Sequence, residues 1–148
     1  MILKGAYFKN TEFIGFHDLG EKPGFQMAMQ KIGERYYIYA ASYRFNGWNI
    51  LEVTNPEKPR FIKWLEGPAG SPSQGCPKIQ IADGIMVTAL GGLLGFLHGT
   101  DDKDNASAIP GVIIWDVKEP ENPKKLSLFK VDGFGVHRFF YNGGRYVY

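Results

Sequence analysis

The sequence has a single cysteine, Cys76, which excludes an intrachain disulfide framework. It also has little excess charge, because 17 basic and 15 acidic residues give a formal net charge of only +2. The two kinds of charge are interleaved, and the longest basic feature is the pair Lys124 and Lys125. A stripe of basic residues that could follow a phosphate backbone is therefore missing, and we expect no nucleic-acid partner.

Long apolar runs are missing too. No stretch approaches the roughly 18–20 apolar residues that a membrane-spanning helix needs. The N-terminal sequence MILKGAYFKN also lacks the apolar core of a secretory signal peptide. We therefore expect no membrane partner and, by default, a cytoplasmic protein.

Glycine, proline and aromatic residues are, by contrast, plentiful. The chain of 148 residues contains 19 glycines, 9 prolines and 15% aromatic residues, and 44% of its residues are apolar, enough for a folded core. The glycines and prolines punctuate short apolar runs, and no segment shows helical periodicity with caps. This pattern favours an all-β protein of many short strands joined by tight turns.

An internal repeat organises these strands. A unit that joins a glycine, an alternating strand, a turn and a second strand begins at Gly24, at Gly75 and at Gly135. A second unit, GWNILEVTNPEKPRFIKWL from Gly47, aligns without a gap with GVIIWDVKEPENPKKLSLF from Gly111, 64 residues later. The shared Val-x-x-Pro-Glu-x-Pro segment predicts a turn, because proline fixes φ and cannot donate to a strand ladder.

Each full period therefore contains four strands, expected in the first period at 26–30, 36–42, 48–53 and 60–65. Tandem four-stranded units of this kind are typical of β-propeller blades, whereas a β-sandwich does not require repeated sequence. We expect tandem four-stranded antiparallel blades of an incomplete β-propeller. The lead-in would span 1–23, the first blade about 24–66, the second about 75–131, and the start of a third 135–148.

The strings YYIYAAS…GWNILEVTNPEKPRFI and MVTAL…GVIIWDVKEPENPKKL resemble the LVIVD-repeat proteins. Blades of that family carry a tyrosine-rich strand, an apolar strand that ends in an acidic-Val pair, and a proline-containing turn. The resemblance covers the chain from Gly24 onward, although neither third strand spells LVIVD literally. It implies a propeller, more distantly similar to the selenium-binding-protein and methanethiol-oxidase propellers, and it implies no particular reaction.

The number of blades raises a question of completeness. A closed propeller needs about 4–8 blades, whereas this chain supplies two and the first half of a third. The sequence therefore predicts a fragment of a longer protein or one part of an assembly. Because an open blade exposes unpaired backbone groups, self-association through open blade edges is a further expectation.

Polar residues at the start of the blades are candidate site residues, because the first strand of a blade lines the central channel. His137 and Arg138 follow the glycine of the third copy. In the earlier copies their aligned residues are Gln26 and Met27, and Pro77 and Lys78. We take Gln26, Lys78 and Arg138 as channel or ligand candidates and His137 as a metal-ligand candidate. The alternative is that His137 hydrogen-bonds to a neighbouring blade.

Two further histidines precede or interrupt the blades. His17 and Asp18 lie in FHDLGEKPG, a loop expected near the same channel mouth, so Asp18 is a further channel or ligand candidate. Its carboxylate is also placed to orient the imidazole. His98 lies in an insertion of the second blade, before an acidic run that does not match an EF-hand loop. An ordinary polar loop is the alternative at both places. Cys76 is expected to pack as a small core residue.

These residues leave two functions open. A ring could bring His17, His98 and His137 together around a transition metal such as Cu, Zn or Fe, although no short-spaced ligand pair supports this. The protein would then be a metal-dependent oxidative or hydrolytic enzyme. The other interpretation, which the sequence favours, is a module that binds a small molecule or a protein ligand without catalysis.

Overall fold

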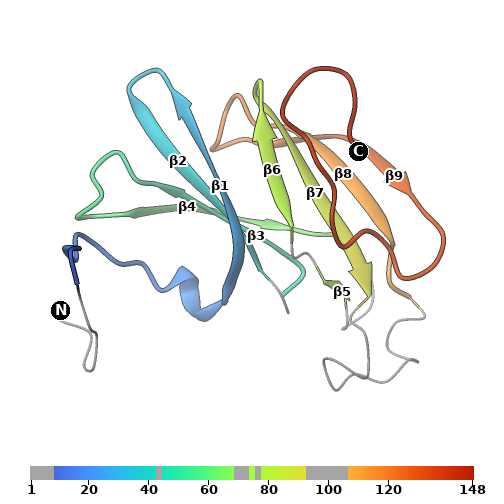
Figure 1. Cartoon of the computed structure of the whole chain (residues 1–148), viewed down its shortest axis with the longest axis horizontal. Coiled ribbons are helices and arrows are strands. Elements are labelled where there is room, and N and C mark those ends of the chain that lie inside the picture. Colours follow the sequence, from blue (N-terminus) through green and yellow to red (C-terminus); the bar gives the residue numbers. More distant parts are fainter. Residues whose placement is uncertain (1–8, 43–44, 69–73, 76–77, 93–106) are drawn as a thin grey trace.

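The computed structural model describes residues 9–42, 45–68, 74–75, 78–92 and 107–148. Within these ranges the chain is all-β, as expected, with two antiparallel sheets and one 3-10 turn, η1 (Leu19–Glu21). The strands of the first sheet pair in chain order (Figure 1): β1 (Gly24–Ile32), β2 (Arg35–Ser42), β3 (Gly47–Glu52) and β4 (Arg60–Glu66). Each of them overlaps a strand predicted for the first period.

The second sheet repeats this arrangement with a divided first strand. Its later strands again pair in chain order: β7 (Ile85–Gly92), β8 (Gly111–Asp116) and β9 (Lys124–Lys130). Along the other edge of β7, β6 (Ile79–Ala82) pairs with residues 85–88, and β5 (Gln74–Gly75) pairs with residues 91–92. Together β5 and β6 therefore take the place that β1 holds in the first sheet.

The register of the last three strands is the same in both sheets. Tyr37 opposes Glu52 in the first sheet, and Ile85 opposes Asp116, the residue 64 positions after Glu52, in the second. The ladder between β3 and β4 shifts just after Ile50, and the ladder between β8 and β9 shifts 64 residues later, just after Ile114. The repeat predicted from the sequence is therefore confirmed down to its irregularity.

The two proline-containing segments form the predicted turns. In the first turn, Lys58 N donates to Asn55 O at 3.1 Å, and Glu57 N donates to Asn55 Oδ1 at 3.0 Å. In the second turn, 64 residues on, Asn122 N donates to Glu119 O at 2.9 Å. The same backbone bond thus closes both turns.

The predicted equivalence of Gln26 with Pro77 is wrong by one residue. Pairing with β2 and with β7 puts Met27 at the place of Ile79. The place of Gln26 in the second sheet therefore belongs to Lys78. An alignment that starts from the glycines misses this shift, because the first strand of each sheet is irregular just after its glycine.

The two sheets pack face to face and bury the main core between them. Two side chains of β1 cross this interface: Gln26 Oε1 accepts from Ile79 N at 3.1 Å, and Gln30 Nε2 donates to Val117 O at 3.0 Å. Most of the rest of the buried interface is apolar, although Trp115 Nε1 donates there to Thr88 Oγ1 at 3.0 Å. Each large apolar side chain buried there stabilises the fold by roughly 1.5–3 kcal/mol. Its buried members are Tyr37, Tyr39, Ala41, Trp48, Ile50, Ile79, Met86, Leu90, Ile113, Trp115 and Val117.

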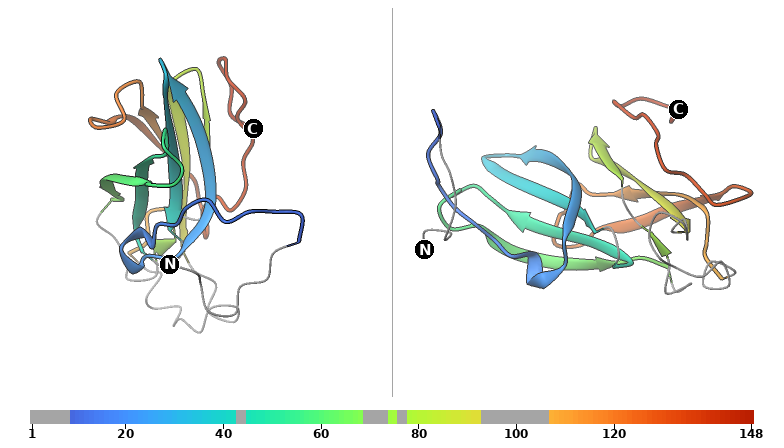
Figure 2. Two further views of the ribbon diagram at one scale, coloured as in Figure 1. Left: turned by 90° about the vertical axis from the view of Figure 1, so that its left-hand side faces the viewer. Right: turned by 60° about the horizontal axis from the view of Figure 1, so that its bottom comes forward.

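Chain segments, and not further sheets, cover the two outer faces of the stack. Residues 9–23 run along the first sheet, and the chain after β9 runs along the second, so the two segments lie at opposite ends (Figures 1 and 2). On the second sheet, Val136, Phe139 and Tyr141 pack against Val87 and Val112.

Residues 135–148 differ from the predicted strand pair, since no strand is assigned there. Phe140 and Tyr148 exchange two backbone hydrogen bonds of 2.7 and 3.0 Å, which close a hairpin-like loop. The backbone between them bonds instead to side chains of the second sheet, because Tyr141 N donates to Gln80 Oε1 and Gly144 N donates to Asp83 Oδ2. These bonds anchor the loop on the second sheet.

Candidate ligand-binding site

Residues 13–19 lie against the outer face of the first sheet, close to the turn between β3 and β4. Gly15 permits this approach, because a Cβ atom at this position would lie 1.9 Å from the carbonyl oxygen of Pro56. The ring of His17 then stacks on Phe61 of β4, with centroids 6.0 Å apart and planes at 18°. The absence of a side chain at Gly15 therefore lets the segment approach the sheet, and the stacked ring of His17 holds it there.

The turn after this segment sets the orientation of His17. Leu19 N donates to His17 Nδ1 at 2.9 Å, and Gly20 N donates to Asp18 Oδ1 at 2.9 Å. Asp18 thus caps η1, and its carboxylate is 63% exposed and 3.8 Å from His17 Nδ1. The close hydrogen bond that orients the imidazole comes from the backbone of Leu19.

A cavity of about 480 Å³ lies between this segment and the sheet; we call it the N-terminal cavity. Its floor consists of small and apolar side chains, Ile38, Ala40 and Leu51. Phe25 and Met27 of β1 form one wall, and because they are 53% and 68% exposed the cavity opens to solvent there. Its volume lies within the range of small-molecule sites.

A second cavity, of about 720 Å³, continues along the same face toward residues 11–14. Both cavities are bordered by Gly15, Ile38 and Val53, so they are neighbours under one segment. The segment therefore covers the outer face incompletely.

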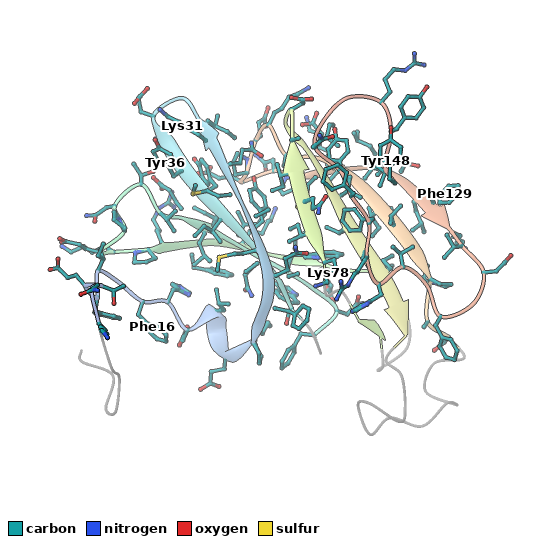
Figure 3. The ribbon with its side chains drawn as sticks, viewed as in Figure 1. Phe16, Lys31, Tyr36, Lys78, Phe129 and Tyr148 are labelled. Carbon is teal, nitrogen blue, oxygen red and sulfur yellow. The ribbon has the colours of Figure 1, made fainter. Side chains whose placement is uncertain are left out.

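Two of the residues singled out in the sequence, His17 and Gln26, border the N-terminal cavity. A third, Lys78, lies next to it, since its Nζ is 4.6 Å from the centroid of the Phe25 ring. In Figure 3, Phe16 and Lys78 mark the N-terminal segment and the second sheet on either side of β1. The structure thus gathers residues from the lead-in, the first sheet and the second sheet at one place.

The other candidates lie elsewhere. His137 and Arg138 are exposed in the segment beyond the second sheet, whereas His17 lies on the outer face of the first. The structure therefore does not bring His17 and His137 together. His98, the acidic run after it and Cys76 lie outside the described residues. In the part of the chain that the structure describes, no three His, Cys, Asp or Glu side chains gather in a way that would hold a metal.

Shifted pKa values occur away from the N-terminal cavity. Burial raises the pKa of Tyr39 well above its ordinary value, and its hydroxyl has no hydrogen-bond partner among the described residues. Burial also raises the pKa of Tyr141. On the β3–β4 pair, the hydrogen bond from Arg60 lowers the pKa of Glu52.

Most residues of the cavity wall were not predicted from the sequence, although β1 carries a signal for them. Apolar Phe25 and Met27 alternate with Gln26 along this strand. The apolar side chains face the cavity, and the glutamine bonds to the second sheet. One face of β1 thus carries apolar side chains and the other carries glutamines. This pattern indicates that both faces of the strand contact other parts of the chain, one of them through apolar groups alone.

Comparisons with known proteins identified no relative of this chain. The chain matches no family model, no curated protein and no solved structure. Among the residues that the structure describes, no helix is long and apolar enough to cross a membrane.

Proposed function

We propose that the chain forms two consecutive blades of an LVIVD-repeat-like β-propeller and works as a module that binds a small molecule. Two four-stranded meanders with the same register, stacked face to face, support the assignment to blades. The outer face of the second sheet also carries exposed apolar side chains, such as Phe129 at 64%, which a further blade would cover.

The binding function rests on the N-terminal cavity. It combines an apolar floor with a few polar groups, which is the composition that small-molecule sites share. His17 carries the proposal: its Nδ1 accepts from Leu19 N, and its Nε2 has no hydrogen-bond partner in the described part of the chain. An oriented imidazole with a free nitrogen at the edge of an apolar cavity is suited to bind a ligand.

A metal-dependent enzyme has less support. The two described histidines that such a site would share, His17 and His137, lie at opposite ends of the stack. One molecule in this conformation does not place both on one metal ion.

The binding site is tested by titrating the ¹⁵N-labelled chain with small apolar compounds and following its NMR spectrum. We expect saturable shifts at residues 15–19 and 24–27, with dissociation constants on the order of 0.1–1 mM for compounds of about ten non-hydrogen atoms. Shifts confined to other parts of the chain, or no saturable shifts, would contradict this site.

A matched pair of variants shows whether the cavity itself is occupied. Ala40→Leu extends the floor into the cavity and is expected to weaken binding roughly tenfold, about 1.4 kcal/mol. Ala82→Leu makes the same change on the second sheet, away from the cavity, and is expected to leave binding unchanged. Circular dichroism of both variants checks that the fold is retained.

A further inference from the structure

We infer that Asn142 is a site of spontaneous deamidation, where the asparagine becomes aspartate or isoaspartate without an enzyme. The inference is independent of the proposed binding function. It follows from a comparison of two Asn-Gly pairs in this chain, Asn46 with Gly47 and Asn142 with Gly143. Because the pair of residues is the same in both places, the fold decides which of them reacts.

The reaction needs a reachable side-chain amide and a free backbone nitrogen. The glycine nitrogen loses its proton to hydroxide and attacks the asparagine Cγ, and Nδ2 takes a proton from water and leaves as ammonia. Glycine favours this step because it has no side chain to restrict its backbone or shield its nitrogen. Water then opens the succinimide ring. Opening at Cγ gives aspartate, whereas opening at the backbone carbonyl gives isoaspartate, in which the main chain runs through the side chain.

Asn142 meets both requirements. It is exposed in the loop of residues 135–148, and its side chain makes no hydrogen bond to a described residue. The backbone nitrogen of Gly143 likewise donates to no described residue, and no strand is assigned in this loop. Gly143 has a φ of 104°, in the region that favours glycine. Rotations within Asn142 can therefore bring its Cγ to the glycine nitrogen.

Asn46 meets neither requirement. Its Nδ2 donates to Pro68 O, and its carbonyl oxygen accepts from Gly67 N at 2.8 Å. The nitrogen of Gly47 donates to Phe45 O at 2.8 Å, and Gly47 is buried at the start of β3. Both reacting groups are engaged, so the attack on Asn46 requires the start of β3 to open first.

Deamidation of Asn142 would loosen the loop from the second sheet. Two bonds anchor the loop on either side of this residue, from Tyr141 N to Gln80 Oε1 and from Gly144 N to Asp83 Oδ2. An isoaspartate adds a methylene group to the backbone between these anchors. Either product also adds a negative charge to a segment that already lies against the carboxylate of Asp83, and like charges repel.

The experiment ages the complete chain at mildly alkaline pH and measures deamidation of Asn142 and Asn46 in its proteolytic peptides by mass spectrometry. We expect Asn142 to react at least roughly tenfold faster than Asn46 in the folded chain. In urea the difference is expected to disappear, because neither pair is then held by the fold. Equal rates in the folded chain, or an unmodified Asn142, would overturn the inference.

The pH dependence and one variant test the route. The rate at Asn142 is expected to rise with pH, because the attacking nitrogen must lose its proton, and a constant rate would overturn the route through Gly143. Asn142→Gln extends an exposed side chain and is expected to stay unmodified, because its ring closure would form a larger, less favoured ring.

Hydrogen exchange then measures the effect on the loop. The amide of Tyr141, which donates to Gln80, is expected to exchange faster in the aged chain than in the fresh chain. The aged Asn142→Gln chain is the matched control and is expected to show no change. Equal exchange at Tyr141 in all three samples would overturn the predicted loosening, whereas the peptide masses decide on the deamidation site itself.

Discussion

Trp48 of β3 meets Trp115 of β8 edge to face, with ring centroids 5.7 Å apart and planes at 68°. The two residues do not hold equivalent places in the repeat, since Trp48 corresponds to Val112 and Trp115 to Leu51. The interface therefore joins one face of the first sheet to the opposite face of the second. A stack of this kind is head-to-tail, and the same contact extends to any further copy of the unit.

This contact predicts that Trp48 is central to stability. Trp48 is fully buried, so Trp48→Ala is expected to lower the free energy of unfolding by roughly 3–5 kcal/mol through the cavity it leaves. Urea unfolding followed by circular dichroism measures the change. Phe129→Ala, which truncates a side chain that is 64% exposed, serves as the control and is expected to cost much less. Equal losses in the two variants would show that the sheet interface does not hold the fold together.

The raised pKa of Tyr39 predicts a loss of stability in alkali. Burial favours the neutral phenol in the folded state, so the pKa of Tyr39 is higher when folded than when unfolded. Its contribution is fully present below the unfolded pKa of about 10 and is lost as pH rises above it, because only the unfolded chain then ionises readily.

Tyr39→Phe isolates this effect. The variant removes a buried hydroxyl that has no partner among the described residues, so at neutral pH we expect it to be as stable as the parent or more stable by up to about 1 kcal/mol. Above about pH 10 the advantage of the variant is expected to grow. Thermal unfolding at a series of pH values, beside the half-exposed control Tyr36→Phe, measures it. A constant difference across this range would refute the assignment.

Gly15 predicts how the N-terminal segment is held. A methyl group at Gly15 would overlap the carbonyl oxygen of Pro56, so Gly15→Ala is expected to displace residues 13–19 from the sheet. An overpacked contact of this kind destabilises the folded state by roughly 1–3 kcal/mol. Because residues 13–19 can lift off the sheet, this cost affects the stability of that segment and not that of the two sheets.

Hydrogen exchange reports on this local change. The amides of Leu19 and Gly20, which donate to His17 and Asp18, are expected to exchange faster in Gly15→Ala, while those in β7 and β8 stay protected. Ligand binding in the N-terminal cavity is expected to weaken in parallel. Glu12→Ala, in the same segment, is the control for a nearby change without the overlap. Unchanged exchange at Leu19 and Gly20 would mean that the segment tolerates the methyl group.

Local patterns predicted the strands well. Alternation and proline turns located all four strands of the first sheet, and the 64-residue repeat extended to the register and the bulge of the second. The third copy was predicted as a strand pair from the same pattern. In the structure it is a loop held on the second sheet, since side chains of Gln80 and Asp83 accept from the backbone of Tyr141 and Gly144, and the sequence pattern does not record such long-range bonds.

The candidate site was predictable only in part. Gln26 and Lys78 were selected at the start of the blades, and His17 was selected beside Asp18 in the lead-in. In the structure His17 and Gln26 border the N-terminal cavity, and Lys78 lies next to it. The expected convergence of His17 with His137 depended on a closed ring. In the structure the chain segments at the two ends of the stack keep the two residues apart.

What the sequence determined by itself is therefore local: the all-β class, the strands of the first sheet, the proline turns and the repeat of the later strands. These properties depend on residues a few positions apart, through alternation and fixed φ angles. Which face of each sheet meets its neighbour was decided only by the tertiary structure. So was the cavity, because it exists only where the segment around Gly15 and His17 lies over Ile38, Ala40 and Leu51, residues far along the chain.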